Sequence, residues 1–356
     1  GNSAIGRNTM CANTTGSNNT AIGLQALLAN TEGDNNVAIG KQALDANTTA
    51  DNNTAVGTAA LGANTTGASN VAVGSCALLC NISGAENTAV GMNAARLTTG
   101  GANVAVGHSA LEDNTSGASN TALGREALHT NTTASNNVAV GKRALYLNTT
   151  GTTNTAVGQN SLHSNTTASD NTAVGAASLY ANTEGTGNVA VGRQALVANL
   201  TGSSNTAIGH IALCANTTGT CNVAIGREAL DSNTTGSVNI AIGTDALQGN
   251  TSGSSNVAIG DDAMKTNSTA SNNVGVGQSA LCSNTTGTEN TAVGKDALKL
   301  NVGAIQNTAV GTSALRDNTT GACNTAVGFN SLVQSTTSSL NTAVGRQTLF
   351  ANTTGT

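Results

Sequence analysis

Apolar and polar residues follow a pattern that repeats about every 17 residues along the whole chain. If each repeat is numbered from its first Asn as position 0, small or β-branched residues fill positions 1 to 3, Gly fills position 4, and Ala-Leu usually fills positions 7 and 8. Residues 19–23 (Asn-Thr-Ala-Ile-Gly) begin one repeat and residues 341–345 (Asn-Thr-Ala-Val-Gly) begin another. A period this short predicts that each repeat is one coil of a solenoid, because a single coil cannot bury its apolar residues alone.

Positions 1 to 3 predict a strand. Position 1 is Thr in eleven coils and Val in eight, and position 3 is Val in thirteen and Ile in seven. These β-branched residues favour strands. Side chains at positions 1 and 3 point to one face, and position 2, which is Ala in every coil except at Gly275, points to the other. Both faces are apolar, so we expect one to face the coil's interior and the other to meet a second sheet or a second chain.

The rest of the coil predicts turns. Gly at position 4 occurs in all twenty-one coils, which indicates a positive φ or a backbone contact too close for a Cβ. Ala-Leu at positions 7 and 8 is too short for a helix, so we predict a second short strand or an extended turn there. The Asn-Thr-Thr-Gly that commonly follows is typical of a turn. The coil that starts at Asn87 is one residue short, and we place the deletion in this loop.

Two asparagine positions predict hydrogen-bonded ladders along the stack. Position 0 is Asn in all twenty-one coils and position 11 is Asn in nineteen, the exceptions being Thr98 and Ser335. Side-chain amides stacked at strand spacing can bond to one another, as they do in cross-β stacks. We therefore expect a structural role for both positions.

Together these features predict an all-β fold, a parallel β-solenoid or β-roll of about 21 coils of 17 residues, forming one continuous array over residues 1–356. Each coil holds little apolar volume, so a lone column would be marginally stable. We therefore expect a homo-oligomer or a self-assembling fibre, most simply a trimer. Because the pattern starts and ends without a capping repeat, we expect the array to be a segment of a longer fibrous chain.

Composition excludes several classes of function. Charged residues make up 9% of the chain and aromatic residues 1%, so a basic groove with stacking platforms for nucleic acid is not expected. No apolar run reaches 18 residues, so no membrane span is expected in this segment. The seven cysteines occupy scattered repeat positions and predict free thiols or small apolar fillers, rather than a disulfide ladder.

The residues that could carry catalysis or bind a metal are scattered along the sequence. The four histidines lie at variable positions as isolated residues: His108, His129, His163 and His210. No His, Cys and Asp set has the spacing of metal ligands, and no nucleophile with a base is recognisable. The sequence therefore predicts no enzymatic activity and no cofactor. An alternative, a glycan-processing enzyme, would require carboxylates clustered across adjacent coils.

Position 11 also carries possible N-glycosylation sites, since Asn-x-Ser/Thr recurs there. The alternative is that the same residues serve only as the turn that the repeat requires. The candidate sites are Asn13, Asn47, Asn64, Asn114, Asn131, Asn148, Asn165, Asn216, Asn233, Asn284 and Asn318.

Two stretches resemble known repeats. Residues 36–43 (Asn-Val-Ala-Ile-Gly-Lys-Gln-Ala) resemble the head repeat of trimeric autotransporter adhesins, and the 17-residue version with residues 64–67 (Asn-Thr-Thr-Gly) also resembles phage and viral tail-fibre repeats. The resemblance implies a left-handed parallel β-roll with three chains per head. The adhesin repeat is usually 14 residues long, so this chain has three extra residues per coil.

The resulting expectation is an extracellular structural fibre or adhesin shaft, at a cell or virion surface, with a surface receptor or glycan as a further partner. A phage or viral tail-fibre shaft is one alternative. Another is an ice-binding surface, which would need Thr at positions 12 and 13 on a flat outward face.

Overall fold

The computed structural model describes residues 1–353 and 355, and in these it shows 21 parallel strands of three residues each and no helix. The predicted all-β parallel β-solenoid with a 17-residue repeat is therefore confirmed. The strands are β1 (Ser3–Ile5), β2 (Thr20–Ile22), β3 (Val37–Ile39), β4 (Thr54–Val56), β5 (Val71–Val73), β6 (Thr88–Val90), β7 (Val104–Val106), β8 (Thr121–Leu123), β9 (Val138–Val140), β10 (Thr155–Val157), β11 (Thr172–Val174), β12 (Val189–Val191), β13 (Thr206–Ile208), β14 (Val223–Ile225), β15 (Ile240–Ile242), β16 (Val257–Ile259), β17 (Val274–Val276), β18 (Thr291–Val293), β19 (Thr308–Val310), β20 (Thr325–Val327) and β21 (Thr342–Val344).

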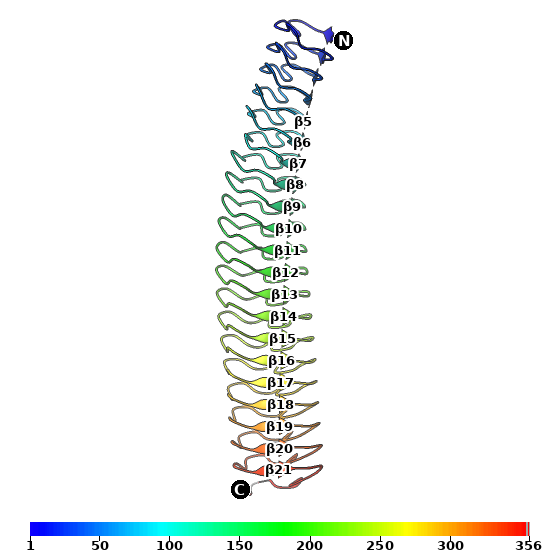
Figure 1. Cartoon of the computed structure of the whole chain (residues 1–356). Helices are drawn as coiled ribbons and strands as arrows, with labels where there is room; N and C mark the ends of the chain where they lie inside the picture. Colours follow the sequence, from blue (N-terminus) through cyan, green and yellow to red (C-terminus); the bar gives the residue numbers. More distant parts are fainter. Residues whose placement is uncertain (354, 356) are drawn as a thin grey trace. The chain divides into compact units, whose positions relative to one another are not determined.

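The chain forms two compact units, residues 1–177 with β1 to β11 and residues 178–356 with β12 to β21. Within each unit every strand pairs with the next one in sequence, as Figure 1 shows for the labelled strands. The register is constant: Ala21 pairs with Ala38, 17 residues on. The one shorter step joins Thr88 to Val104, at the predicted deletion. The handedness, the number of chains in an assembly and the single continuous array stay predictions.

The interior of each coil is filled by Ala and Leu. Ala38 at position 2, with Ala43 and Leu44 at positions 7 and 8, is completely buried. Val37 and Ile39, at positions 1 and 3, point outward, and Ile39 is 37% exposed. The prediction that one strand face meets the coil's interior is thus confirmed, and it is the Ala face. The opposite face remains partly exposed in the single chain.

The Ala-Leu segment forms a turn, so the second strand that we considered is absent from the described coils. Residues 41–46 are all in turns, and Gln42 and Leu44 have φ values of 57° and 52°. The left-handed conformation costs about 1–2 kcal/mol for a residue with a Cβ. Complete burial of the Leu side chain, about 1.5–3 kcal/mol, offsets this cost. The Leu44 N–H also donates to the carbonyl oxygen of Ala60 in the next coil, at 2.9 Å.

Gly at position 4 meets both requirements predicted for it. Gly57 has a φ of 136°, which L side chains rarely adopt, and a Cβ there would lie 2.5 Å from the carbonyl oxygen of Gly74 in the next coil. Closely stacked backbones at this corner therefore exclude any side chain.

Candidate functional site

Two asparagine ladders run along each unit, as predicted. At position 11, Asn30 Nδ2 donates to Asn13 Oδ1 of the preceding coil at 2.9 Å. At position 0, the backbone N–H of Asn36 donates to Asn19 Oδ1 at 2.8 Å. The Nδ2 atoms of Asn19 and Asn30 both donate to the carbonyl oxygen of Gly33, at 2.8 and 3.0 Å. The two ladders are therefore joined within each coil at position 14.

The position-11 ladder is interrupted at both exceptions noted in the sequence. Thr98 and Ser335 have no amide to donate, and the Oδ1 atoms of Asn81 and Asn318 in the preceding coils are buried without a hydrogen-bond partner. Asn114 Nδ2 reaches Thr98 Oγ1 only at 3.4 Å. An unsatisfied buried acceptor is destabilising, so these two coils are weak points of the ladder.

The candidate glycosylation sites are members of this ladder. All except the half-buried Asn13 are completely buried: Asn47, Asn64, Asn114, Asn131, Asn148, Asn165, Asn216, Asn233, Asn284 and Asn318. In the ten buried sites both Nδ2 hydrogens are in use, as for Asn64, which donates to Asn47 Oδ1 at 3.2 Å and to Gly67 O at 2.9 Å. A glycan on Nδ2 would displace one of these bonds and has no path out of the stack. The folded coil therefore favours the alternative, that these residues build the turn.

The threonines at positions 12 and 13, where an ice-binding face was expected, lie in the turn of each coil. The chain bends at both positions, for example at residues 48 and 49. The position-12 hydroxyls are also engaged, since Thr31 Oγ1 donates to Thr48 O at 3.1 Å and Thr234 Oγ1 donates to Thr251 O at 2.9 Å. The engaged hydroxyls do not favour an ice-binding face at position 12, and the expectation for position 13, where Thr49 is exposed, stays a prediction.

A regular apolar surface is formed by the strand face, which we define as the outward side chains at positions 1 and 3. It offers two columns of Thr, Val and Ile along each unit. The exposed fraction is 36–46% for Ile22, Ile39, Val90, Val104, Leu123 and Val174 of the first unit, and 36–38% for Ile208, Ile240, Ile259, Val293 and Val310 of the second. A continuous apolar patch of this kind marks a surface that binds another molecule.

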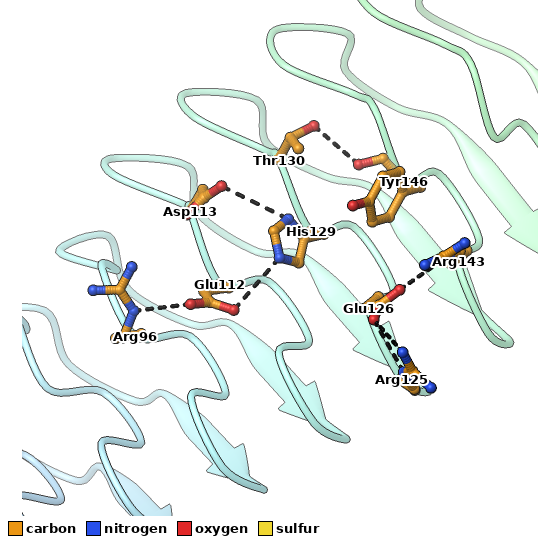
Figure 2. A network of polar contacts seen from close by, with 9 residues as sticks. All are labelled: Arg96, Glu112, Asp113, Arg125, Glu126, His129, Thr130, Arg143 and Tyr146. Atoms are coloured by element: carbon orange, nitrogen blue, oxygen red, sulfur yellow. Dashed lines mark hydrogen bonds and ion pairs between the residues drawn. The ribbon is translucent and has the colours of Figure 1, made fainter.

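A polar network lies on another side of the coil, at position 9 and its neighbours (Figure 2). Arg96 Nε pairs with Glu112 Oε1 at 3.0 Å. The ring of His129 lies between two carboxylates, with Nε2 3.4 Å from Glu112 Oε2 and Nδ1 3.7 Å from Asp113 Oδ2. Tyr146 follows, with its ring centroid 5.3 Å from that of His129. Four consecutive coils are joined in this way.

The network corrects the description of the histidines as isolated. His163 stacks on Tyr146 at 5.2 Å, so Tyr146 has a histidine ring on each side. Residues 129, 146 and 163 are spaced by 17, and comparison of position 9 from coil to coil would have revealed the column from the sequence. Burial, together with the charge of Arg143, lowers the pKa of His163. His108 and His210 lie elsewhere, exposed at position 5.

Glu126 is the most strongly perturbed carboxylate of this network. Hydrogen bonds from Arg143 and then Arg125 lower its pKa to about 2, despite opposing burial. Its Oε2 lies 2.5 Å from Arg143 Nε, and its Oε1 lies 2.8 Å from Arg125 Nη2. The Arg143 guanidinium also lies 5.3 Å from the centroid of the Tyr146 ring. These contacts bind neighbouring coils together and hold Glu126 as a carboxylate.

The second unit has ion pairs of the same kind. Lys265 Nζ bridges Asp245 at 2.9 Å and Asp262 at 2.8 Å, and hydrogen bonds to Asp262 and then Asp245 raise its pKa. Arg227 pairs with Glu228 and, at 3.4 Å, with Asp245. Partly exposed pairs such as these each contribute about 0.2–1 kcal/mol. These ion pairs hold neighbouring coils together.

Other groups that carry chemistry are dispersed. All seven cysteines are free thiols in the structure: Cys11, Cys76, Cys80, Cys214, Cys221, Cys282 and Cys323. The described residues contain no group of three or more His, Cys, Asp and Glu placed to hold a metal ion. Nor do they include a helix with the length and apolar character needed to cross a membrane.

Comparison with known proteins adds no relative. No protein-family model and no curated protein matches this chain.

Proposed function

We propose that this chain is a structural, non-catalytic segment of an extracellular fibre, a shaft or head that works by being long and stiff and that assembles sideways with other chains. The single observation that carries the proposal is the strand face: in every coil the side chains at positions 1 and 3 point outward, and the fold of the single chain leaves them partly exposed. The asparagine ladders support it further, because they commit the polar side chains of each coil to its neighbours.

The strand face must be buried along its length to form a stable contact. A three-residue strand spans about 10 Å and strands lie about 4.8 Å apart, so each coil offers roughly 50 Å² of flat face. The eleven strands of the first unit then offer on the order of 500 Å² in projection, and more once the relief of the side chains is counted. A specific interface buries about 800 Å² per partner, so burial along the whole stack is needed.

The resemblance to adhesin heads and tail-fibre repeats favours a trimer at a cell or virion surface, with a receptor or glycan as its target. Adhesin and tail-fibre versions share the same mechanism: a rigid stack holds a binding surface away from its anchor. The proposed lateral contact is common to both.

Lateral assembly is tested by placing charges on the strand face. In Val140→Lys with Val157→Lys, both substitutions lie at position 3 of adjacent coils. The matched control is Thr133→Lys with Thr150→Lys, which adds the same charge to exposed turns. Sedimentation should give several chains for the unaltered protein and the control, and one chain for the strand-face variant. A single-chain mass for the unaltered protein, or an unchanged mass for the strand-face variant, would contradict the proposal.

A second candidate function is binding to a regular lattice such as ice, and the strand face is the place for it. Position 1 is Thr in four consecutive strands, where Thr291, Thr308, Thr325 and Thr342 pair in register. A flat row of evenly spaced hydroxyls and methyl groups could match ordered water. Thermal hysteresis in a crystal-growth assay would support this candidate. If neither the unaltered protein nor the Val140→Lys, Val157→Lys variant, which is expected to remain a single chain, shows thermal hysteresis, the candidate function is excluded.

A further inference from the structure

The strand face of the first unit has edges of opposite charge. Position 5, two residues after the strand, carries the basic residues Arg7, Lys41, Arg125 and Lys142 and no acidic residue in residues 1–177. We call this column the basic edge. Positions 15 and 16, directly before the next coil's Asn, carry Asp34, Asp51, Glu86 and Asp170 and no basic residue in the same unit. We call this column the acidic edge. Eight of the thirteen Lys and Arg residues in the whole chain occupy position 5, so the segregation is not a property of composition alone.

The charges of both edges are available to a partner. Arg7, Lys41 and Lys142 are exposed, and no ion pair within the described chain involves them. Arg125 pairs with Glu126, and its side chain remains 59% exposed. On the acidic edge, Glu86 and Asp170 are exposed.

The other two acidic residues are held in place along the stack. Asp34 Oδ1 accepts the N–H of Ser17 at 2.6 Å, and Asp51 Oδ1 accepts the N–H of Asp34 at 2.7 Å. These bonds orient both half-buried carboxylates along the acidic edge.

The levels of the charges along the stack also correspond. The basic residues follow β1, β3, β8 and β9, and the acidic residues precede β3, β4, β6 and β11. Each acidic residue is therefore within two coils of a basic one, which is about 10 Å at strand spacing. Along the stack this separation does not exceed about one Debye length, 8–10 Å at physiological ionic strength, so attraction between the two edges is partly screened there and is strongest at low salt.

Symmetry then decides how two such faces meet. If two copies face each other with their stacks pointing in the same direction, the strands of the two sheets run in opposite directions, and the basic edge of each copy meets the acidic edge of the other. The same pairing holds when three copies surround one axis. If the stacks point in opposite directions, basic meets basic and acidic meets acidic.

We propose that the strand face binds a second copy of this chain with its stack in the same direction, and that pairing of basic and acidic edges sets this polarity. The inference rests on the proposed lateral assembly and goes beyond it. A second copy is the fitting partner because its side chains repeat with the same spacing, so contacts made in one coil recur in every coil. The opposite edges make the match depend on direction.

Polarity is measured directly on the full chain. A gold label on the N-terminus, viewed by electron microscopy, should mark one end of each assembly, with same-end labelling at least tenfold more frequent than labelling at opposite ends. Assemblies labelled at opposite ends would overturn this inference and leave lateral assembly standing. Chains that stay single would overturn both.

A charge exchange tests the cause. Lys41 and Asp34 both lie at the level of β3, on opposite edges. Lys41→Glu and Asp34→Lys should each raise the dissociation constant of the assembly roughly tenfold at low salt, since each contact occurs at both edges of a pair. The double variant should return it to within about threefold of the unaltered chain. Circular dichroism checks that the coils stay folded. The chain itself has Ala68 at position 15 of another coil, so a carboxylate at this position is not required for folding.

The matched control is Asp113→Lys, the same change at position 10, away from the strand in Figure 2. It should leave the dissociation constant unchanged. If the double variant fails to recover although folded, or if Asp113→Lys weakens assembly as much as Asp34→Lys, the edges do not set the polarity.

Discussion

Replacement of one ladder asparagine by serine tests how much the position-11 ladder stabilises the stack. Asn233 Nδ2 donates to Asn216 Oδ1 at 2.9 Å and to Gly236 O at 3.0 Å, and Asn233 Oδ1 accepts from Asn250 Nδ2 at 2.8 Å. Asn233→Ser removes all three bonds. The chain already contains this situation at Ser335, where the acceptor of the preceding coil is left without a partner.

The expected loss follows from the contacts. Three hydrogen bonds contribute about 1 kcal/mol each, and the orphaned Asn216 Oδ1 costs about 1–3 kcal/mol because the site is completely buried. The serine hydroxyl can recover about one bond locally, as Ser335 does with Ser338. The net decrease in the free energy of local opening should be about 3–5 kcal/mol.

Hydrogen exchange measured by mass spectrometry is the suitable assay, because long repeat arrays do not unfold in one step and a local probe is needed. Amides of residues 216–250 should exchange faster in Asn233→Ser. The control is Asn272→Ser, the same change at an exposed position 16 where φ is 61° and where Ser255 already adopts 59°. We expect the control to change local opening by less than about 0.5 kcal/mol. Equal effects of the two substitutions would refute the reasoning.

Three further predictions concern other contacts. Ser335→Asn combined with Ser338→Ala, which copies the Asn and Ala of intact coils such as Asn165 and Ala168, should restore the missing donor and raise the free energy of local opening by about 1–3 kcal/mol; exchange no slower than in Ser338→Ala alone would contradict this. Gly124→Ala should lower the free energy of unfolding, measured by urea titration, by about 2–5 kcal/mol. The reason is that φ is 132° at Gly124 and the new Cβ would lie 2.7 Å from the carbonyl oxygen of the next coil. A loss below about 1 kcal/mol would disprove the close contact. Glu126 has a folded pKa of about 2 against its ordinary 4.5, so its contribution is present above pH 4.5 and is lost as the pH falls toward 2. Glu126→Gln should therefore lower the free energy of unfolding by about 1–2 kcal/mol at pH 6, a value that allows for solvent screening of the exposed arginine partners, and should change it almost not at all at pH 2. Thermal melts at the two pH values measure this difference. An equal loss of stability at both would contradict the ion pairs as its cause.

The repeat made much of the fold predictable. Invariant Asn and Gly at positions 0 and 4 indicated the ladder and the tight corner, and both have that role in the structure. The apolar strand indicated that one of its faces meets the interior, and the structure identifies this as the Ala face at position 2. At Ala-Leu the sequence left a short strand and an extended turn open, because residue type does not reveal the positive φ of Leu44, which follows from the burial of its side chain. The order of consecutive residues also concealed His129, Tyr146 and His163, since they become neighbours only when the stack forms.

The hydrogen bonds between coils have a consequence for how the chain reaches its fold. Thr20 N bonds to Asn36 O and Leu27 N bonds to Ala43 O, so a coil finds its backbone partners 16 or so residues away, however long the array is. The sequence separation of contacts therefore stays constant while length grows, and this low contact order favours rapid folding. Ribosomes add about 5–20 residues per second, which gives roughly one to three seconds per coil. Closing a loop of about ten residues takes about 10–100 ns. Each coil therefore has time to form its hydrogen bonds with the preceding coil during synthesis, so the part of the stack already folded acts as a template for the next coil.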